Sequence, residues 1–156
     1  MNSDFLILAG GHVPTQNRFF QKMKLHELMT AYEGVILGIS AGTMNSADIV
    51  YAQPELEGES TDSAYQRFLR GLNLTKCMII PHYQDIKDQI LDGKRLFEDI
   101  TYPDSYGQKF YALPDGSYLY SKKGVEKICG EAYLIQNGNC VKACSDGEEL
   151  ALNLDC

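Results

Sequence analysis

The feature that most constrains this chain is the segment Gly-Ile-Ser-Ala-Gly at residues 38–42, which follows a short apolar run at residues 35–37. The apolar run is typical of a buried strand, and the residues after the second glycine have a composition compatible with a helix. A serine between two such glycines, on a tight turn from strand to helix, is the pattern of a nucleophile elbow. The glycines leave room for the turn and for an approaching substrate. The sequence therefore predicts either a nucleophilic Ser40 or a serine that only caps the helix.

The chain before this segment predicts a parallel strand–helix–strand unit. Residues 5–9 are apolar and predict a buried strand. Residues 16–32 predict a helix with Thr15 as its N-cap and one apolar face. A strand, a helix and a second strand over this spacing form a βαβ unit with parallel strands.

Parallel strands end at the same edge of a sheet, so the turn that ends the first strand should lie beside the elbow. That turn is Gly10-Gly11. Its backbone N–H groups, together with the N–H of Ala41, are the donors that an oxyanion hole needs. The alternative is an ordinary turn at Gly10-Gly11.

Later segments predict further strands and one long helix. Residues 77–80 predict a third buried strand, and residues 85–100 predict an amphipathic helix that Gly93 weakens. From residue 109 the pattern changes to short strands and turns, including a hairpin at Asn137-Gly138-Asn139. This part predicts antiparallel strands at one side of a parallel sheet.

A serine nucleophile needs a base and an orienting acid. Among the three histidines, His82 ends a buried strand at the edge where catalytic groups collect, which favours it as the base over His12. Glu55 is the best-placed acid, while Glu57, Glu59 and Asp62 are alternatives in the same acidic loop. A solvated loop is the other interpretation of these carboxylates.

Composition and charge bound the remaining possibilities. The 156 residues predict a single domain over residues 1–156, and the net charge of −7 argues against nucleic acid and anionic membranes as partners. No run is long enough for a transmembrane helix, and no signal peptide is visible. Five scattered cysteines fit reduced thiols in the cytoplasm. No metal or cofactor motif is visible, so we expect neither a metal nor a cofactor.

The chain resembles a family of serine peptidases that includes dipeptidase E (aspartyl dipeptidase) and cyanophycinase. Three motifs in order carry the resemblance: the strand that ends in Gly10-Gly11, the Gly-Ile-Ser-Ala-Gly segment, and Ile-Ile-Pro-His at residues 79–82. Ala-Leu-Pro-Asp-Gly at residues 112–116 is similar to the family's late strand and turn. The resemblance spans nearly the whole chain.

The resemblance implies a class I glutamine amidotransferase-like fold, a three-layer α/β structure with a mostly parallel sheet between helices. It implies that Ser40 is the nucleophile, that His82 is the base and that Gly11 and Ala41 supply oxyanion donors, with Glu55 as the acid. The implied reaction is hydrolysis of a peptide bond in a small peptide, with an aspartyl residue at the scissile bond, through an acyl-enzyme. An esterase with the same triad is an alternative.

The chain also departs from the family. Members of the family begin with additional β-α units before the strand that here starts at Phe5. The sheet would then have a bare edge or face, which favours association between chains. We therefore expect a homo-oligomer, and a truncated, non-catalytic binding or assembly module is the rival interpretation.

Overall fold

The apolar runs of the sequence form strands, but these strands do not join into one sheet. The structure is a computed structural model that describes residues 3–152, and the strands of this part form several small sheets. Within it, parallel pairing joins β1 (Phe5–Leu8) to β2 (Val35–Gly38) and β5 (Met78–Ile80) to β8 (Lys109–Ala112). The other strand pairs are antiparallel. The predicted three-layer, mostly parallel sheet is therefore wrong, and the fold is a mixed α/β arrangement of small sheets.

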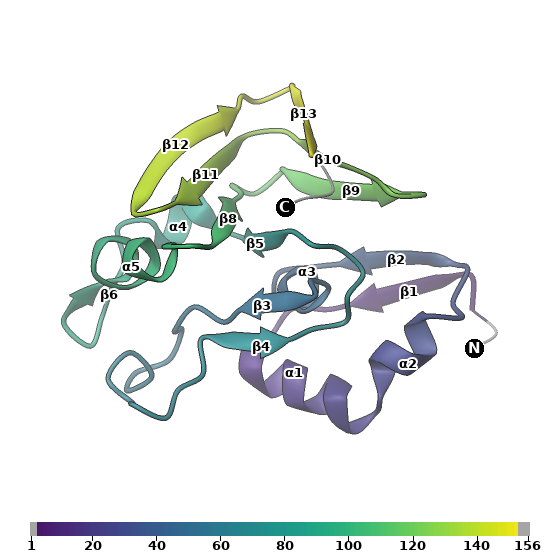
Figure 1. Cartoon of the computed structure of the whole chain (residues 1–156), viewed down its shortest axis with the longest axis horizontal. Coiled ribbons are helices and arrows are strands. Elements are labelled where there is room, and N and C mark those ends of the chain that lie inside the picture. Colours follow the sequence, from purple (N-terminus) through teal and green to yellow (C-terminus); the bar gives the residue numbers. More distant parts are fainter. Residues whose placement is uncertain (1–2, 153–156) are drawn as a thin grey trace. The chain divides into compact units, whose positions relative to one another are not determined.

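The chain divides into two units (Figure 1). The N-terminal unit comprises Met1–Ala52 and Gln66–Lys76, and the C-terminal unit comprises Gln53–Tyr65 and Cys77–Cys156. The prediction of a single domain over residues 1–156 stays a prediction, and we describe each unit separately.

The N-terminal unit contains the strand–helix–strand segment that the sequence predicts. Its elements are β1, α1 (Val13–Lys22), α2 (Leu25–Met29), β2, α3 (Ala41–Asn45), β3 (Ile49–Tyr51) and β4 (Phe68–Arg70). The predicted helix over residues 16–32 is divided, because Lys24 adopts a left-handed backbone conformation between α1 and α2. The helix also begins at Val13, with His12 rather than Thr15 at the N-cap.

The β1–β2 sheet buries only one of its faces. Leu8 is buried and packs with Phe20, Leu25 and Met29 of the two helices. The alternate side chains are exposed, with 54% of Ile7 and 61% of Val35 accessible to solvent. The predicted strands are therefore present, but β1 is not fully buried. The predicted homo-oligomer stays a prediction.

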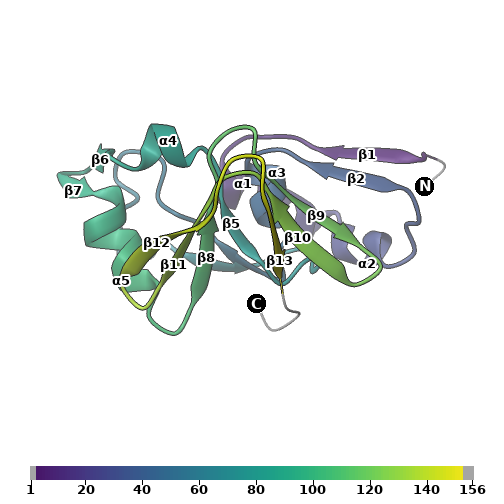
Figure 2. The ribbon, with the colours of Figure 1, turned by 90° about the horizontal axis from the view of Figure 1, so that it is seen from above.

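The C-terminal unit is rich in antiparallel strands, as the sequence predicts for the chain beyond residue 109. Figure 2 shows its four-stranded sheet in the order β12-β11-β8-β5, and a three-stranded sheet has the order β13-β10-β9. Its elements are β5, α4 (Tyr83–Ile86), β6 (Ile90–Leu91), β7 (Lys94–Arg95), the π-helix η1 (Leu96–Thr101), α5 (Tyr102–Asp104), β8, β9 (Tyr118–Lys122), β10 (Val125–Cys129), β11 (Ala132–Gln136), β12 (Asn139–Cys144) and β13 (Glu149–Leu152).

Two predictions for this unit have opposite outcomes. The predicted hairpin is confirmed, because Asn137 and Gly138 both have positive φ between the paired strands β11 and β12. The predicted helix over residues 85–100 is wrong, because the short hairpin β6–β7 interrupts it. Asp92 and Gly93 form the turn of that hairpin with φ of 52° and 76°.

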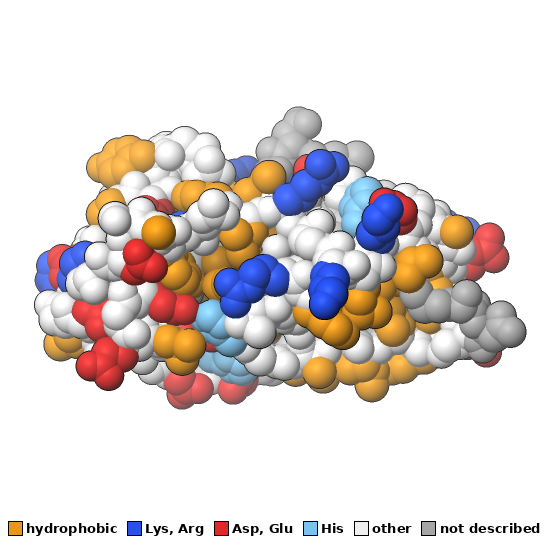
Figure 3. Space-filling view, turned by 90° about the horizontal axis from the view of Figure 1, so that it is seen from below, with side chains coloured by type: hydrophobic (Ala, Val, Ile, Leu, Met, Phe, Trp, Pro, Cys, Tyr) orange, Lys and Arg blue, Asp and Glu red, His pale blue; other side chains and the backbone are white. Residues whose placement is uncertain are grey.

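The helices and the surface charges of residues 3–152 both bear on possible partners. Within residues 3–152, every helix is too short or too polar to cross a lipid bilayer. On the face drawn in Figure 3, acidic and basic side chains are scattered among apolar ones.

Candidate active site

Ser40 occupies a strained turn between a strand and a helix. Its backbone has φ of 51° and ψ of −117°, and it lies between β2 and α3. A non-glycine residue with positive φ and this ψ is rare and unfavourable, and such residues cluster at functional sites. The first turn of α3 closes immediately, because the carbonyl of Ser40 accepts the N–H groups of Thr43 (2.9 Å) and Met44 (3.1 Å). The predicted strand–turn–helix geometry around Ser40 is confirmed.

The two glycines of the segment permit close backbone contacts. A Cβ atom on Gly42 would overlap the carbonyl oxygen of Leu8 in β1. A Cβ atom on Gly38 would lie 2.9 Å from the backbone nitrogen of Thr43. The Gly-x-Ser-x-Gly spacing therefore follows from packing at both positions, with helix α3 seated directly against β1.

The turn after β1 lies beside Ser40, as the parallel pairing predicts. A Cβ atom built on Gly10 would lie 3.4 Å from the Cβ and 3.9 Å from the Oγ of Ser40. Gly11 follows with φ of 147°, in the region that favours glycine. Ala41 is the first residue of α3, where a backbone N–H has no acceptor within the helix. The roles of Gly10, Gly11 and Ala41 as oxyanion donors stay predictions.

A buried asparagine pair fixes α3 against α1. The Nδ2 of Asn17 donates to the Oδ1 of Asn45 at 2.8 Å and to the carbonyl of Arg70 at 2.9 Å. The Nδ2 of Asn45 donates to the carbonyl of Val13 (3.2 Å) and to the Oε1 of Gln16 (3.0 Å). Asn45 is fully buried, so these bonds compensate the cost of removing its amide from water.

His82 and Asp115 follow two parallel strands that end side by side. In the register of β5 and β8, Ile80 lies opposite Ala112. The pairing continues past the strands, because the N–H of Leu113 donates to Ile80 (2.8 Å) and the N–H of Tyr83 donates to Leu113 (3.1 Å). Residues just after the two strands are thereby brought together at one sheet edge.

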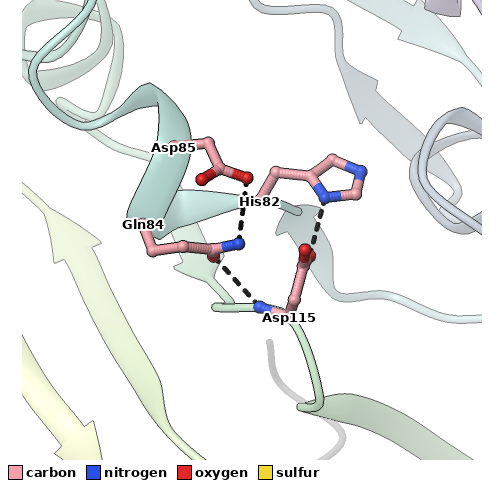
Figure 4. A network of polar contacts seen from close by, with 4 residues as sticks. All are labelled: His82, Gln84, Asp85 and Asp115. Atoms are coloured by element: carbon pink, nitrogen blue, oxygen red, sulfur yellow. Dashed lines mark hydrogen bonds and ion pairs between the residues drawn. The ribbon is translucent and has the colours of Figure 1, made fainter.

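The imidazole of His82 contacts the carboxylate of Asp115 (Figure 4). The Nδ1 of His82 lies 2.7 Å from the Oδ1 of Asp115. A carboxylate can only accept, so this contact places a proton on Nδ1 and leaves Nε2 as the basic nitrogen of the neutral ring. Both side chains are solvent-accessible, at 42% for His82 and 60% for Asp115.

Helix α4 carries His82 at its N-cap and is anchored by Tyr83. The Tyr83 ring packs edge-on against Phe97, with 5.3 Å between centroids, and at a tilt against Tyr133, with 4.6 Å between centroids. The Tyr83 hydroxyl lies 3.6 Å from the Sγ of Cys140. Burial raises the pKa of the Tyr83 phenol well above its usual value, so this group stays neutral at physiological pH.

Two of the predicted acids of the loop, Glu59 and Asp62, accept local backbone hydrogen bonds. The Oε2 of Glu59 accepts the backbone N–H of Glu55 (2.9 Å) and that of Leu56 (3.0 Å). The Oδ1 of Asp62 accepts the N–H of Ala64 at 2.8 Å. Glu57 is exposed. The carboxylate in contact with His82 is that of Asp115, which the sequence analysis did not consider as the acid, and the role of Glu55 stays a prediction.

Asp115 could have been found from two signals that the sequence contains. It lies in the Ala-Leu-Pro-Asp-Gly segment, directly after a predicted strand. Catalytic groups in parallel sheets follow the carboxyl ends of strands. The missing information was the pairing of β5 with β8, which are about thirty residues apart and have no local signal for their register.

The other candidate base, His12, belongs to the same unit as Ser40. Its Nδ1 lies 2.9 Å from the Oγ1 of Thr15, in the first turn of α1. This contact joins two side chains and is not a capping bond to the helix backbone. His12 therefore stays the alternative base.

One group of side chains could in principle hold a metal ion. His82, Asp85 and Asp115 each offer a ligand atom, and these atoms lie within 4.8 Å of one another. All three are solvent-accessible, and exposed acidic groups commonly gather without a metal. This arrangement alone does not define a metal site, and the expected absence of a metal or cofactor stays a prediction.

Comparisons with known proteins give no family for this chain. No protein-family model matches the sequence, and no curated protein matches it. The function is therefore inferred from the geometry of Ser40, His82 and Asp115.

Proposed function

We propose that the protein is a serine hydrolase that cleaves a peptide bond through an acyl-enzyme. The observation that carries the proposal is the backbone of Ser40, a non-glycine residue at φ 51° and ψ −117° between a strand and a helix. A serine held in this way presents its hydroxyl at the end of a sheet, as a nucleophile elbow does. The contact between His82 and Asp115 supports the proposal, because it supplies an oriented base.

The proposed triad is Ser40, His82 and Asp115, with Asp115 taking the place that the sequence analysis gave to Glu55. Ser40 Oγ attacks the scissile carbonyl while His82 Nε2 accepts its proton. His82 then gives this proton to the leaving amine, and a water molecule deacylates the enzyme by the same route. Asp115 holds the Nδ1–H tautomer and stabilises the imidazolium. We propose that Gly11 and Ala41 donate to the oxyanion.

The substrate class comes from the resemblance to dipeptidase E-type peptidases. We propose small peptides with an aspartyl residue at the scissile bond. The four cysteines that the structure describes form no disulfide with one another, and we propose a reducing compartment such as the cytoplasm. Cys156 lies outside the described residues.

Hydrolysis of dipeptides by purified protein tests the proposal. We expect cleavage of Asp-X dipeptides in preference to X-Asp dipeptides and simple aryl esters. Ser40→Ala should lower kcat by about a million-fold, since the nucleophile acts as a unit with its base. Ser46→Ala, at the other end of α3, is the matched control and should retain activity.

The outcomes of this assay separate the candidate functions. Cleavage of aryl esters alone would favour the esterase. A wild-type protein that cleaves neither class would favour the non-catalytic binding or assembly module.

A further inference from the structure

We propose that Gln84 is a positioning residue for the acid–base pair. Its side chain holds the turn that carries Asp115, and Asp85 sets the direction in which the Gln84 amide points. The inference rests on the proposed function of His82 and Asp115, and it adds two residues that neither the sequence analysis nor the proposed mechanism uses.

The Gln84 amide bridges two groups (Figure 4). Its Oε1 accepts the backbone N–H of Asp115 at 3.0 Å. Its Nε2 donates to the Oδ2 of Asp85 at 3.0 Å. The same glutamine is therefore bound at the residue whose carboxylate contacts His82, and at an acidic neighbour on its own helix.

Asp85 removes the ambiguity in the orientation of this amide. An ionised carboxylate only accepts hydrogen bonds, so it selects the NH₂ end of Gln84. The oxygen end is then the one that accepts the backbone N–H of Asp115. Asp85 thus acts on the acid–base pair through Gln84, by keeping the amide from flipping.

Asp115 projects from an exposed turn. It is a tight turn in which the N–H of Ser117 donates to Pro114 at 3.1 Å, and Gly116 has φ of 93°. Asp115 is 60% exposed, and exposed ion pairs hold their side chains only weakly. A hydrogen bond at the N–H of Asp115 itself fixes the backbone from which the carboxylate projects.

Gln84 also belongs to the helix that His82 begins, because α4 starts directly after His82. The bridge therefore ties Asp115 to the same short segment that carries the base. The pairing of β5 with β8 brings the base and the acid together, and the hydrogen bond from Asp115 to Gln84 fixes the acid relative to α4.

Four variants test this inference by steady-state kinetics and by NMR. Gln84→Leu removes both hydrogen bonds. It should lower kcat by about 10- to 100-fold with KM changed less than about twofold, because a misplaced acid affects the transition state more than binding. The Asp115 amide should exchange with solvent about fivefold faster, as expected for one lost hydrogen bond. Nitrogen shifts of His82 should show a mixture of tautomers in place of the Nδ1–H form.

A charge swap provides a rescue that a purely structural role would not show. Gln84→Glu alone places a carboxylate against Asp85 and should reproduce most of the Gln84→Leu defect. In the double variant Gln84→Glu/Asp85→Asn, the new amide at position 85 can donate to the new carboxylate at position 84, which still accepts from the N–H of Asp115. Kinetics and Asp115 exchange should then return to within about threefold of wild type, as a restored hydrogen bond predicts. Gln89→Leu, an exposed glutamine outside the network of Figure 4, is the control.

Unchanged Asp115 exchange and unchanged His82 tautomer in Gln84→Leu would overturn the inference. A double variant no better than Gln84→Glu would also overturn it. The NMR readouts do not depend on turnover. If the wild-type protein hydrolyses nothing, the proposed function fails, while Asp115 exchange and the His82 tautomer still decide whether Gln84 positions the pair.

Discussion

Ser40 combines an unfavourable backbone with a chemically useful side chain. A non-glycine residue in a sparsely populated φ/ψ region costs about 1–3 kcal/mol, and glycine relieves most of that strain. Glycine also lowers stability relative to alanine by about 0.4–1 kcal/mol, because the unfolded chain has more conformations at a glycine. Ser40→Gly should therefore be more stable than Ser40→Ala by about 1 kcal/mol, while both variants lose activity.

Urea unfolding of the two Ser40 variants measures this difference directly. A Ser40→Gly variant less stable than Ser40→Ala would show that the turn is not strained at this residue. The result would remove the main structural support for the elbow.

Substitutions at two glycines near Ser40 should have different effects, one on stability and the other on activity. Gly42→Ala places a methyl group on the Leu8 carbonyl, so it should destabilise the fold by about 2 kcal/mol or more. Gly10→Ala makes only ordinary contacts, with its methyl 3.4 Å from the Cβ of Ser40. It should keep its unfolding midpoint and lose at least about tenfold in kcat/KM by crowding the nucleophile. Equal unfolding midpoints for the two variants would contradict this interpretation.

At the residue scale, the sequence correctly predicted the features that depend on residues close together in the chain. The turn at Ser40 and its proximity to Gly10 follow from a strand, a helix and a second strand in direct succession. The sequence places Asp115 just after a predicted strand, but its contact with His82 depends on the pairing of strands distant in sequence. Proximity in the chain favoured the acidic loop at Glu55 instead.

At the element scale, the buried asparagine pair should carry a large part of the stability of α3. Asn45→Ala leaves the buried carbonyl of Val13 without the Asn45 amide, which should cost about 1–3 kcal/mol. Gln21→Ala is the control, because Gln21 is an exposed amide that donates to the carbonyl of Arg70, as the buried Asn17 does. Urea unfolding should show a clear loss for Asn45→Ala and less than about 0.5 kcal/mol for the control. Similar losses in both would contradict the role given to the buried pair.

The stability of the fold should depend on pH through Asp92, whose carboxylate binds the loop at residues 58–60. Hydrogen bonds from the N–H of Gly58 and the hydroxyl of Ser60 lower the pKa of Asp92 below its usual value. A carboxyl with a lowered folded-state pKa contributes stability above its unfolded-state pKa of about 4, and this stability is lost as the pH falls through the lowered value.

Asp92→Asn should therefore weaken the decline in stability as the pH falls below about 4, since this contribution is absent from the variant. Denaturant unfolding as a function of pH measures the decline. Asp146→Asn, in the exposed turn before β13, should leave it unchanged. A decline as steep in Asp92→Asn as in wild type would contradict the assignment.

The wrongly predicted helix over residues 85–100 shows that tertiary contacts can override the local preference for a helix. Residues 85–100 have apolar spacing that suits a helix, yet Asp92 and Gly93 turn the chain back. The carboxylate of Asp92 accepts bonds from the loop at Gly58 and Ser60, so contacts from outside the segment stabilise that turn. Such contacts cannot be read from apolar periodicity.

At the scale of the whole molecule, the sequence identified most strands but not how they combine. The apolar runs at residues 5–9, 35–37 and 77–80 predict strands of one parallel sheet, whereas β1–β2 and β5–β8 lie in separate sheets with different neighbours. Strand β8 pairs with β5 on one side and with the antiparallel β11 on the other. Pairing between distant strands depends on tertiary packing, which is why this part of the fold could not be predicted.

We propose that His82 and Asp115 activate Ser40, and this proposal can be tested by active-site labelling. The full chain would be treated with a fluorophosphonate and analysed by intact mass, beside Ser40→Ala, His82→Ala and Asp115→Asn. The account predicts one adduct on the wild type, none on Ser40→Ala, and labelling slowed by at least about a hundredfold in the other two variants. Labelling that persists in Ser40→Ala, or a wild type that forms no adduct, would contradict it.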